Sequence, residues 1–196
     1  MKSKEITVWN DGTGIVTALA VTDELANANG LNKKKTLHLR LLCEELMGMM
    51  RAVAGEMKAV YSVENEDNVY KLTLSANTEM YITKRQEFIA LSTEGKNSAA
   101  KGFMGKLRDV FEIALSKDDR TDTFSSFGMM GMSSPGAYRA TQEVMAWSLS
   151  DYRSELSKGD EWDELERSIV ASIADNVEVF IKGDNVTIVI TKAMDE

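Results

Sequence analysis

The sequence predicts an α+β fold: a two-layer α/β sandwich with helices on one face of a mixed, mostly antiparallel sheet. Two observations predict it. Segments in which apolar and polar residues alternate come in adjacent pairs, and segments in which apolar residues recur every three or four positions also come in groups. The two kinds of segment do not alternate one by one, which disfavours a doubly wound parallel sheet. With 196 residues, 43% of them apolar, the chain fits a single domain, 1–196, with a sizeable core.

The first half of the chain is predicted to run β-α-α-β-β. Glycines are expected to end both helices, because glycine tolerates the left-handed conformation of a helix cap. The polar stretch "ENEDN" between the two later strands is typical of a hairpin loop. The expected elements are a strand at Ile6–Trp9, a helix from Ile15 to Gly30, a helix from about Thr36 to Gly55, and strands at Met57–Val63 and Val69–Ala76.

The second half is predicted to hold a long connection, three helices and a final hairpin. Residues 77–101 carry little period, and a connection of this length is typical of a lid or binding loop. Gly183-Asp184-Asn185 is a strong hairpin turn signal. The expected helices cover about 105–115, 137–156 and 162–174, and the expected strands cover 176–182 and 185–192.

Composition excludes several function classes. The net charge of -8 disfavours nucleic-acid binding, which needs a basic surface, and "NKKKTLHLR" is interpreted as a solvated helix end. No apolar run of about 18 residues exists, so no membrane span is expected. The single cysteine, Cys43, excludes an internal disulfide and a cysteine-built zinc site. We therefore expect a cytoplasmic protein whose partner is another protein or a second copy of itself.

The stretch "NDGTGIV", Asn10 to Val16, links the first strand to the first helix. Glycines in such a place can cradle a phosphate or can simply allow a change of direction. We interpret it as a turn, with Thr13 as the helix N-cap.

"CEELMGMM" places an acid beside the apolar stripe of the second helix. Glu45 lies four residues before Met49, so both project from one side of the helix, one turn apart. A carboxylate there is either the polar border of a buried face or an acid that orients a water or a metal-bound phosphate. The stripe itself is Leu39, Leu42, Leu46, Met49 and Val53.

The stretch "GLNKKKTLHLRLLCEELMGMM" is similar to the N-box helix of the GHKL ATP-binding superfamily, which includes gyrase, the heat-shock chaperone, histidine kinases and mismatch-repair ATPases. The approach to the helix most resembles the bacterial anti-sigma-factor serine kinases. The resemblance implies a Bergerat-type fold that binds ATP with magnesium. In the family's Glu-x-x-x-Asn motif, Glu45 matches the glutamate that polarises the attacking water or accepts a hydroxyl proton. Met49 stands where the family's asparagine holds magnesium, and a thioether is a poor ligand for that hard cation.

Two further motifs extend the resemblance. In "LTLSANTEM", Ala76 or Asn77 takes the place of the family's aspartate, which accepts the adenine amino group, and Thr78 and Met80 stand at glycine positions. "AKGFMGKLRDVFE" is similar to the glycine-rich end of the ATP lid, where backbone amides face a phosphate; its alternative is a plain loop before a helix. Its candidate phosphate-binding residues are Lys101, Gly102, Gly105 and Lys106.

Three functions remain open on the sequence. The first is a regulatory protein of this fold with a degraded nucleotide site, which binds a partner or a ligand other than ATP. The second is an ATP-binding serine kinase or weak ATPase with Glu45 as the acid–base residue and magnesium bound only with ATP. The third is a structural module that oligomerises through the Met- and Phe-rich segment 124–132, within an insertion at about 116–159 that has no family counterpart.

Overall fold

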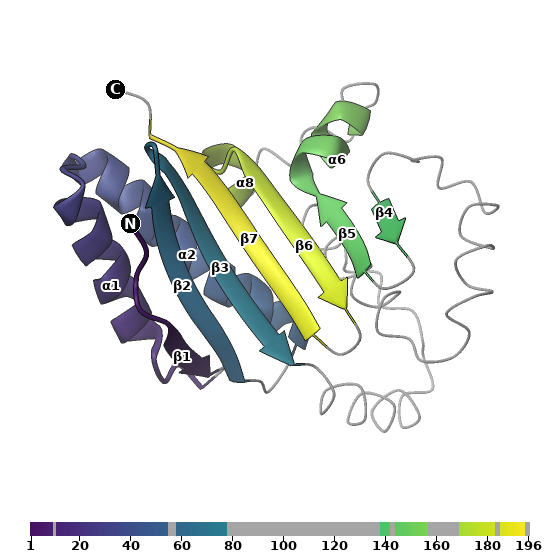
Figure 1. Ribbon diagram of the computed structural model, residues 1–196, viewed down its shortest axis with the longest axis horizontal. Coiled ribbons are helices and arrows are strands. Elements are labelled where there is room, and N and C mark those ends of the chain that lie inside the picture. The colour runs from purple at the N-terminus through teal and green to yellow at the C-terminus, as the bar shows by residue number, and fades with distance from the viewer. Residues whose placement is uncertain are drawn as a thin grey trace.

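The computed structural model describes residues 1–9, 11–54, 58–77, 138–141, 144–156, 169–182 and 185–194. These residues form one seven-stranded sheet in the order β1-β2-β3-β7-β6-β5-β4. Every pairing in it is antiparallel. Figure 1 shows α1 and α2 together behind the strands, and the two-layer α+β sandwich predicted from the sequence is confirmed. The strands are β1 (Ile6–Trp9), β2 (Lys58–Glu66), β3 (Val69–Asn77), β4 (Tyr138–Thr141), β5 (Val144–Ser148), β6 (Asn176–Lys182) and β7 (Asn185–Ala193).

Four helices accompany the sheet in the described part of the chain. They are α1 (Ile15–Ala28), α2 (Lys33–Ala54), α6 (Leu149–Leu156) and α8 (Ile169–Ile173). α1 packs against β1 and β2, and α2 packs against β3, β7 and α8. The predicted helix over about 105–115 and the predicted connection from 78 onward lie outside the described residues.

The core lies between the helices and one face of the sheet. Alternate residues of the four long strands point into it, as the alternating sequence pattern predicts. The hairpin between β2 and β3 turns at Asp67 and Asn68, which have φ angles of 50° and 64°, as expected for a two-residue turn of the type that fits the twist of the sheet. The core-facing strand residues are Ala59, Tyr61, Val63, Tyr70, Leu72, Leu74, Ala76, Val177, Val179, Ile181, Val186, Ile188 and Ile190.

The helix predicted over about 137–156 is wrong in its first half. Residues 138–141 and 144–148 form β4 and β5, and β5 pairs with β6, so this part of the predicted insertion extends the same sheet. The helix begins only at Leu149, where the Ser148 hydroxyl accepts a hydrogen bond from the amide of Asp151 (3.4 Å). Cross-strand pairing of Trp147, which is buried, outweighs the helical spacing of the apolar residues.

α6 is fastened to the helical layer by Arg153. Its guanidinium donates hydrogen bonds to the carbonyl oxygens of Ala171, Ala174 and Asp175, which lie at the end of α8. A cation at a helix C-terminus satisfies carbonyls that have no partner within the helix. Of the helix predicted over about 162–174, the described part confirms Ile169–Ile173.

The segment between β1 and α1 forms the predicted turn, but the residue that caps the start of α1 differs from the prediction. The N-cap is Gly14, not Thr13, and the amide of Thr13 donates to Asp11 Oδ1 (2.8 Å). Gly14 has a φ of 85°, and a Cβ built on it would lie 2.1 Å from the carbonyl oxygen of Thr7. β1 therefore passes so close to the start of α1 that only glycine fits.

We expect Gly14→Ala to lower the free energy of unfolding by about 2–4 kcal/mol, because it combines a left-handed backbone conformation with a steric overlap. Gly12→Ala is the matched control: Gly12 also has a positive φ, 99°, but a Cβ there meets nothing within 4 Å. Its expected cost is about 1–2 kcal/mol. Urea denaturation measures both, and equal losses would contradict the close approach of β1 to α1.

Candidate functional site

The candidate site is built on α2, which starts with a side-chain cap and buries one stripe. The amide of Lys35 donates to Asn32 Oδ1 (3.0 Å), which satisfies one of the free donors at the helix start. The predicted stripe is confirmed in its described members: Leu39, Leu42, Leu46 and Met49 are buried. This stripe lies against β3 and β7 at the centre of the sheet.

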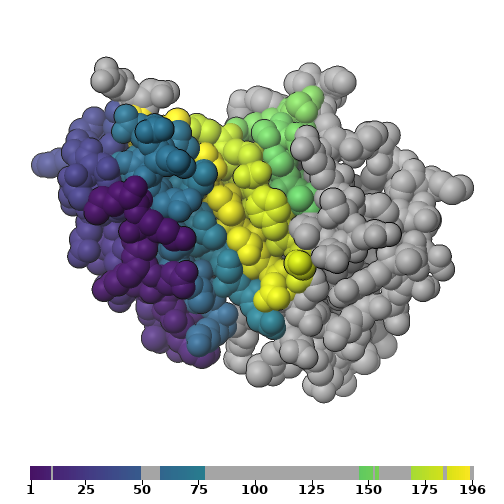
Figure 2. All heavy atoms as spheres, viewed as in Figure 1, coloured from purple at the N-terminus to yellow at the C-terminus, as the bar shows by residue number. Residues whose placement is uncertain are grey.

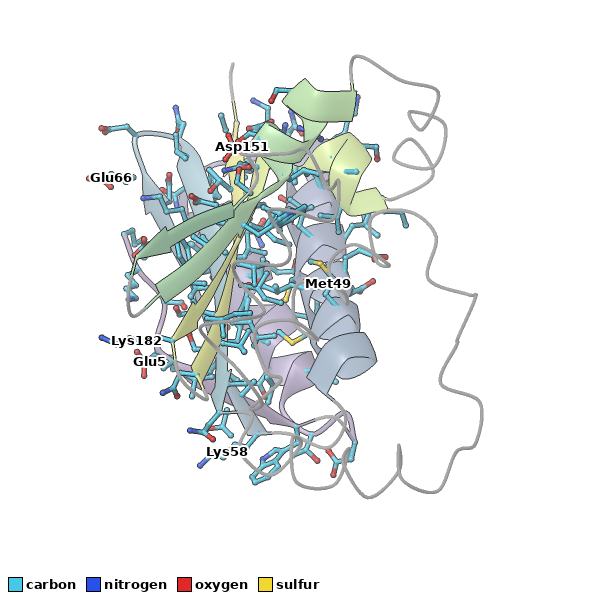
Figure 3. The ribbon with its side chains drawn as sticks, turned by 90° about the vertical axis from the view of Figure 1, so that its right-hand side faces the viewer. Glu5, Met49, Lys58, Glu66, Asp151 and Lys182 are labelled. Atoms are coloured by element: carbon cyan, nitrogen blue, oxygen red, sulfur yellow. The ribbon has the colours of Figure 1, made fainter. Side chains whose placement is uncertain are left out.

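Glu45 and Met49 differ in their surroundings although they lie one turn apart. Glu45 is half-buried at the border of the stripe. Met49 is only 1% exposed and belongs to the apolar core. Figure 3 shows it between α2 and the sheet. The position that the resemblance assigns to a magnesium ligand therefore holds a thioether surrounded by apolar side chains.

The strand end that the resemblance assigns to adenine is divided between the two faces of the sheet. Ala76 is 6% exposed, faces the helices and shares the core with Met49, but its side chain has no acceptor. Asn77 has an amide but is exposed on the opposite face, where its Nδ2 donates to Asn185 Oδ1 (3.4 Å). Neighbouring residues of a strand point to opposite faces, so Asn77 cannot replace the missing acceptor on the helical side.

The four lid residues of the predicted site lie outside the described residues. They are Lys101, Gly102, Gly105 and Lys106. Met49 and Ala76 thus both belong to the apolar core, Glu45 lies at the border of the buried stripe, and Asn77 lies on the opposite face of the sheet.

A buried polar chain beside the stripe was missed by the sequence reasoning. Thr22 Oγ1 donates to the carbonyl oxygen of Ala18 (2.8 Å), so the Tyr61 hydroxyl must donate to Thr22 Oγ1 (2.6 Å). The buried Cys43 thiol lies close to the hydroxyls of Tyr61 and Thr22. The Thr22–Tyr61 hydrogen bond joins α1 to β2 through the core, and Cys43 brings α2 to the same place. Its only sequence signal was a threonine and a cysteine on the inner sides of two amphipathic helices.

Burial governs the acid–base behaviour of this chain. Burial raises the pKa of the Cys43 thiol, and it raises the pKa of Tyr61 far above the ordinary phenol range. A thiol that stays protonated is a poor nucleophile and a poor metal ligand. Cys43 is thus a structural residue, as expected of a buried small side chain.

An ion-pair group fixes the outer side of α2 against α1. Arg40 Nη1 lies 2.6 Å from Asp23 Oδ2 on α1, and Arg40 Nε lies 3.4 Å from Glu44 Oε1 one turn along α2. These three side chains are partly exposed, so the contribution of each pair to stability is small. Their effect is to set how α1 lies along α2.

The described residues show neither a cluster of metal-binding side chains nor a membrane-spanning helix. No three His, Cys, Asp or Glu side chains within the described ranges lie close enough together to hold a metal ion. No helix among those described is both long and apolar enough to cross a membrane.

Comparison of the chain with protein-family models, with curated proteins and with solved structures found no match.

We expect the stability of the protein to fall as pH rises above about 8.5, the ordinary thiol pKa. Above it the unfolded chain loses the Cys43 proton and the folded chain keeps it, so each pH unit costs up to about 1.4 kcal/mol. In Cys43→Ala and Cys43→Ser this part of the slope should be lost while other titrations remain. Urea denaturation between pH 8 and pH 10.5 measures it, and identical slopes in all three proteins would refute the buried thiol's role.

Proposed function

We propose that this chain is a regulatory protein with a histidine-kinase-like ATPase fold. Its nucleotide site has lost the side chains that would bind magnesium and adenine. The protein acts by binding a protein partner, or a ligand other than ATP. The observation that carries the proposal is the burial of Met49 and Ala76 in one apolar core. An ATP site of the type the resemblance implies needs an oxygen ligand for magnesium at the first position and an acceptor for adenine at the second.

Burial matters more than residue type alone in this argument. An exposed methionine would leave room for water or a neighbouring carboxylate to complete a magnesium shell, because magnesium keeps several waters when bound. Met49 is instead packed in the core, where replacing a methionine by a polar group lowers stability. Asn77 lies on the other face, where its side-chain amide is hydrogen-bonded to Asn185.

The kinase or ATPase alternative rests on Glu45. Its half-buried position at the border of the stripe suits an acid–base residue, since such a residue needs contact with both protein and substrate. Catalysis would still require other residues to bind the magnesium ion, because Met49 offers it no oxygen ligand. We place the protein in the cytoplasm as part of the proposal, which the buried, unpaired Cys43 supports.

We expect ATP and ADP to bind the wild-type chain no more tightly with magnesium than without it. The physical reason is that α2 offers the magnesium ion no oxygen ligand at position 49. Isothermal titration calorimetry with each nucleotide, in the presence of Mg²⁺ and of a chelator, measures this. Micromolar binding that depends on magnesium would contradict the proposal and favour the kinase or ATPase, in which case Glu45→Gln should abolish turnover and leave binding intact.

Met49→Asn tests kinship with an ATP site directly. We expect it to cost about 2–4 kcal/mol of stability, because it buries an amide and loses apolar contacts. We also expect magnesium ATP to raise its melting temperature. Met47→Asn is the matched control: Met47 is also buried on α2, so its stability loss should be similar, without any gain from the nucleotide. No magnesium-dependent gain in Met49→Asn would remove the main support for the kinship.

A further inference from the structure

Asn29 and Gly30 stand at the end of α1 and form the only Asn-Gly pair in the sequence. Asn29 is the C-cap residue of the helix, and Gly30 has a φ of 71°, a left-handed conformation that glycine readily adopts. In such a pair the backbone nitrogen of the glycine can attack the side-chain carbonyl carbon of the asparagine, because no side chain obstructs its approach. Every other asparagine is followed by a residue that carries a side chain. Asn29 is therefore the asparagine of this chain that is chemically most reactive toward deamidation.

Two hydrogen bonds hold the Asn29 side chain in the folded protein. Its Nδ2 donates to the carbonyl oxygen of Leu25 (2.7 Å), and its Oδ1 accepts from Asn65 Nδ2 (2.8 Å). A carbonyl oxygen can only accept, so the first bond fixes which end of the Asn29 amide faces Asn65. Asn65 is itself only 9% exposed, and its Nδ2 lies 3.4 Å from the Tyr70 hydroxyl. Figures 1 and 2 show the end of α1 beside the β2–β3 hairpin at the upper left of the molecule, where this contact is made.

The attacking nitrogen is engaged as well. The Gly30 amide donates a hydrogen bond to the carbonyl oxygen of Asn27 (3.0 Å). Deamidation requires this amide to lose its proton and the Asn29 side chain to turn toward it, so the bonds from Asn29 to Leu25 and Asn65 must also break. We call these three hydrogen bonds the latch. While the latch is closed, neither of the two reacting groups is free to react.

We propose that Asn29 is a modification site at which the chain deamidates spontaneously, and that the latch delays the reaction until the end of α1 opens. The Gly30 nitrogen loses its proton and forms a bond to Cγ of Asn29, and the side-chain amide leaves as ammonia. Water then adds to one carbonyl of the resulting cyclic imide and breaks one of its C–N bonds, which leaves aspartate or isoaspartate. Water is the only co-reactant and ammonia the only by-product. This inference does not depend on the proposed loss of the nucleotide site.

Deamidation weakens the latch that delays it. A carboxylate at position 29 has no N–H group for the carbonyl oxygen of Leu25, and its oxygen is repelled by that carbonyl. A negative charge at the C-terminal end of a helix also opposes the helix dipole. The hydrogen bond from Asn65 can still be accepted by the carboxylate. The end of α1 therefore opens more readily once the reaction has taken place, and the modified chain keeps a record of its opening.

Peptide mass spectrometry of the full chain tests the site and the latch together. The folded chain and the chain unfolded in guanidinium chloride are incubated side by side at mildly alkaline pH. In the unfolded chain Asn29 should deamidate faster than any other asparagine. In the folded chain its rate should be at least about tenfold lower, because the reaction waits for local opening. Equal rates in the two states would overturn the latch, and an unfolded chain without preferential reaction at Asn29 would overturn the site.

Asn65→Ala tests the part of the latch that comes from β2. It removes one hydrogen bond from Asn29 and leaves the Asn-Gly pair intact, so Asn29 in the folded variant should deamidate roughly two- to tenfold faster than in the wild type. Val179→Ala is the matched control: Val179 is buried in β6, so its loss lowers overall stability without touching the latch, and the rate should stay near that of the wild type. Equal acceleration in both variants would assign the protection to global stability and overturn the latch.

The effect of the product on the latch is tested with Asn29→Asp, which carries the same carboxylate as the deamidated chain. Asn27→Asp is the control, because Asn27 is an exposed residue in the same last turn of α1 and meets the same helix dipole. Asn29→Asp should lower the midpoint of urea denaturation more than Asn27→Asp does, since only position 29 faces the carbonyl oxygen of Leu25. Equal midpoints in the two variants would contradict the weakening of the latch by its own product.

Discussion

One constraint shapes the described structure: a seven-stranded antiparallel sheet that is covered by helices on one face only. Every long strand must therefore place its large apolar residues at alternate positions, and α2 must supply a continuous apolar stripe across the centre of the sheet. Leu39, Leu42, Leu46 and Met49 provide that stripe and are buried. The hydrogen bond between Thr22 and Tyr61 and the close approach of β1 at Gly14 both serve the same packing, since they set how α1 fits against β2 and β1.

The same constraint decides what the candidate site can do. On the helical side, space is taken up by apolar packing, so a methionine that continues the stripe cannot also leave a polar cavity beside it. At the end of β3 the two-residue period of the strand sends Ala76 and Asn77 to different sides of the sheet. The amide of Asn77 therefore cannot take the place of an acceptor at position 76. The order of residues in the motif does not reveal this difference.

Much of the fold was predictable from the sequence because its elements have strong local patterns. The alternation in β2, β3, β6 and β7 and the spacing along α2 gave bounds within a few residues of the observed ones. The error over 138–148 has a physical cause: β4 and β5 are short, and their assignment depends on pairing with β6, which the sequence of that segment does not contain. The burial of Met49 was expected, but the hydrogen bond between Thr22 and Tyr61 joins residues 39 positions apart, and no local pattern in the sequence links them. The roles of Lys101, Gly102, Gly105 and Lys106 stay predictions.

The two faces of the sheet place different demands on their residues. On the helical face the alternate side chains of the strands are used for packing, and Glu45 is half-buried at the border of α2. The opposite face packs against no described helix, and its strand positions include charged side chains such as Lys58, Glu64 and Glu66 of β2 and Glu178 of β6. A side chain that fills the core cannot also contact a ligand, so among the described residues only the partly exposed side chains are available for binding.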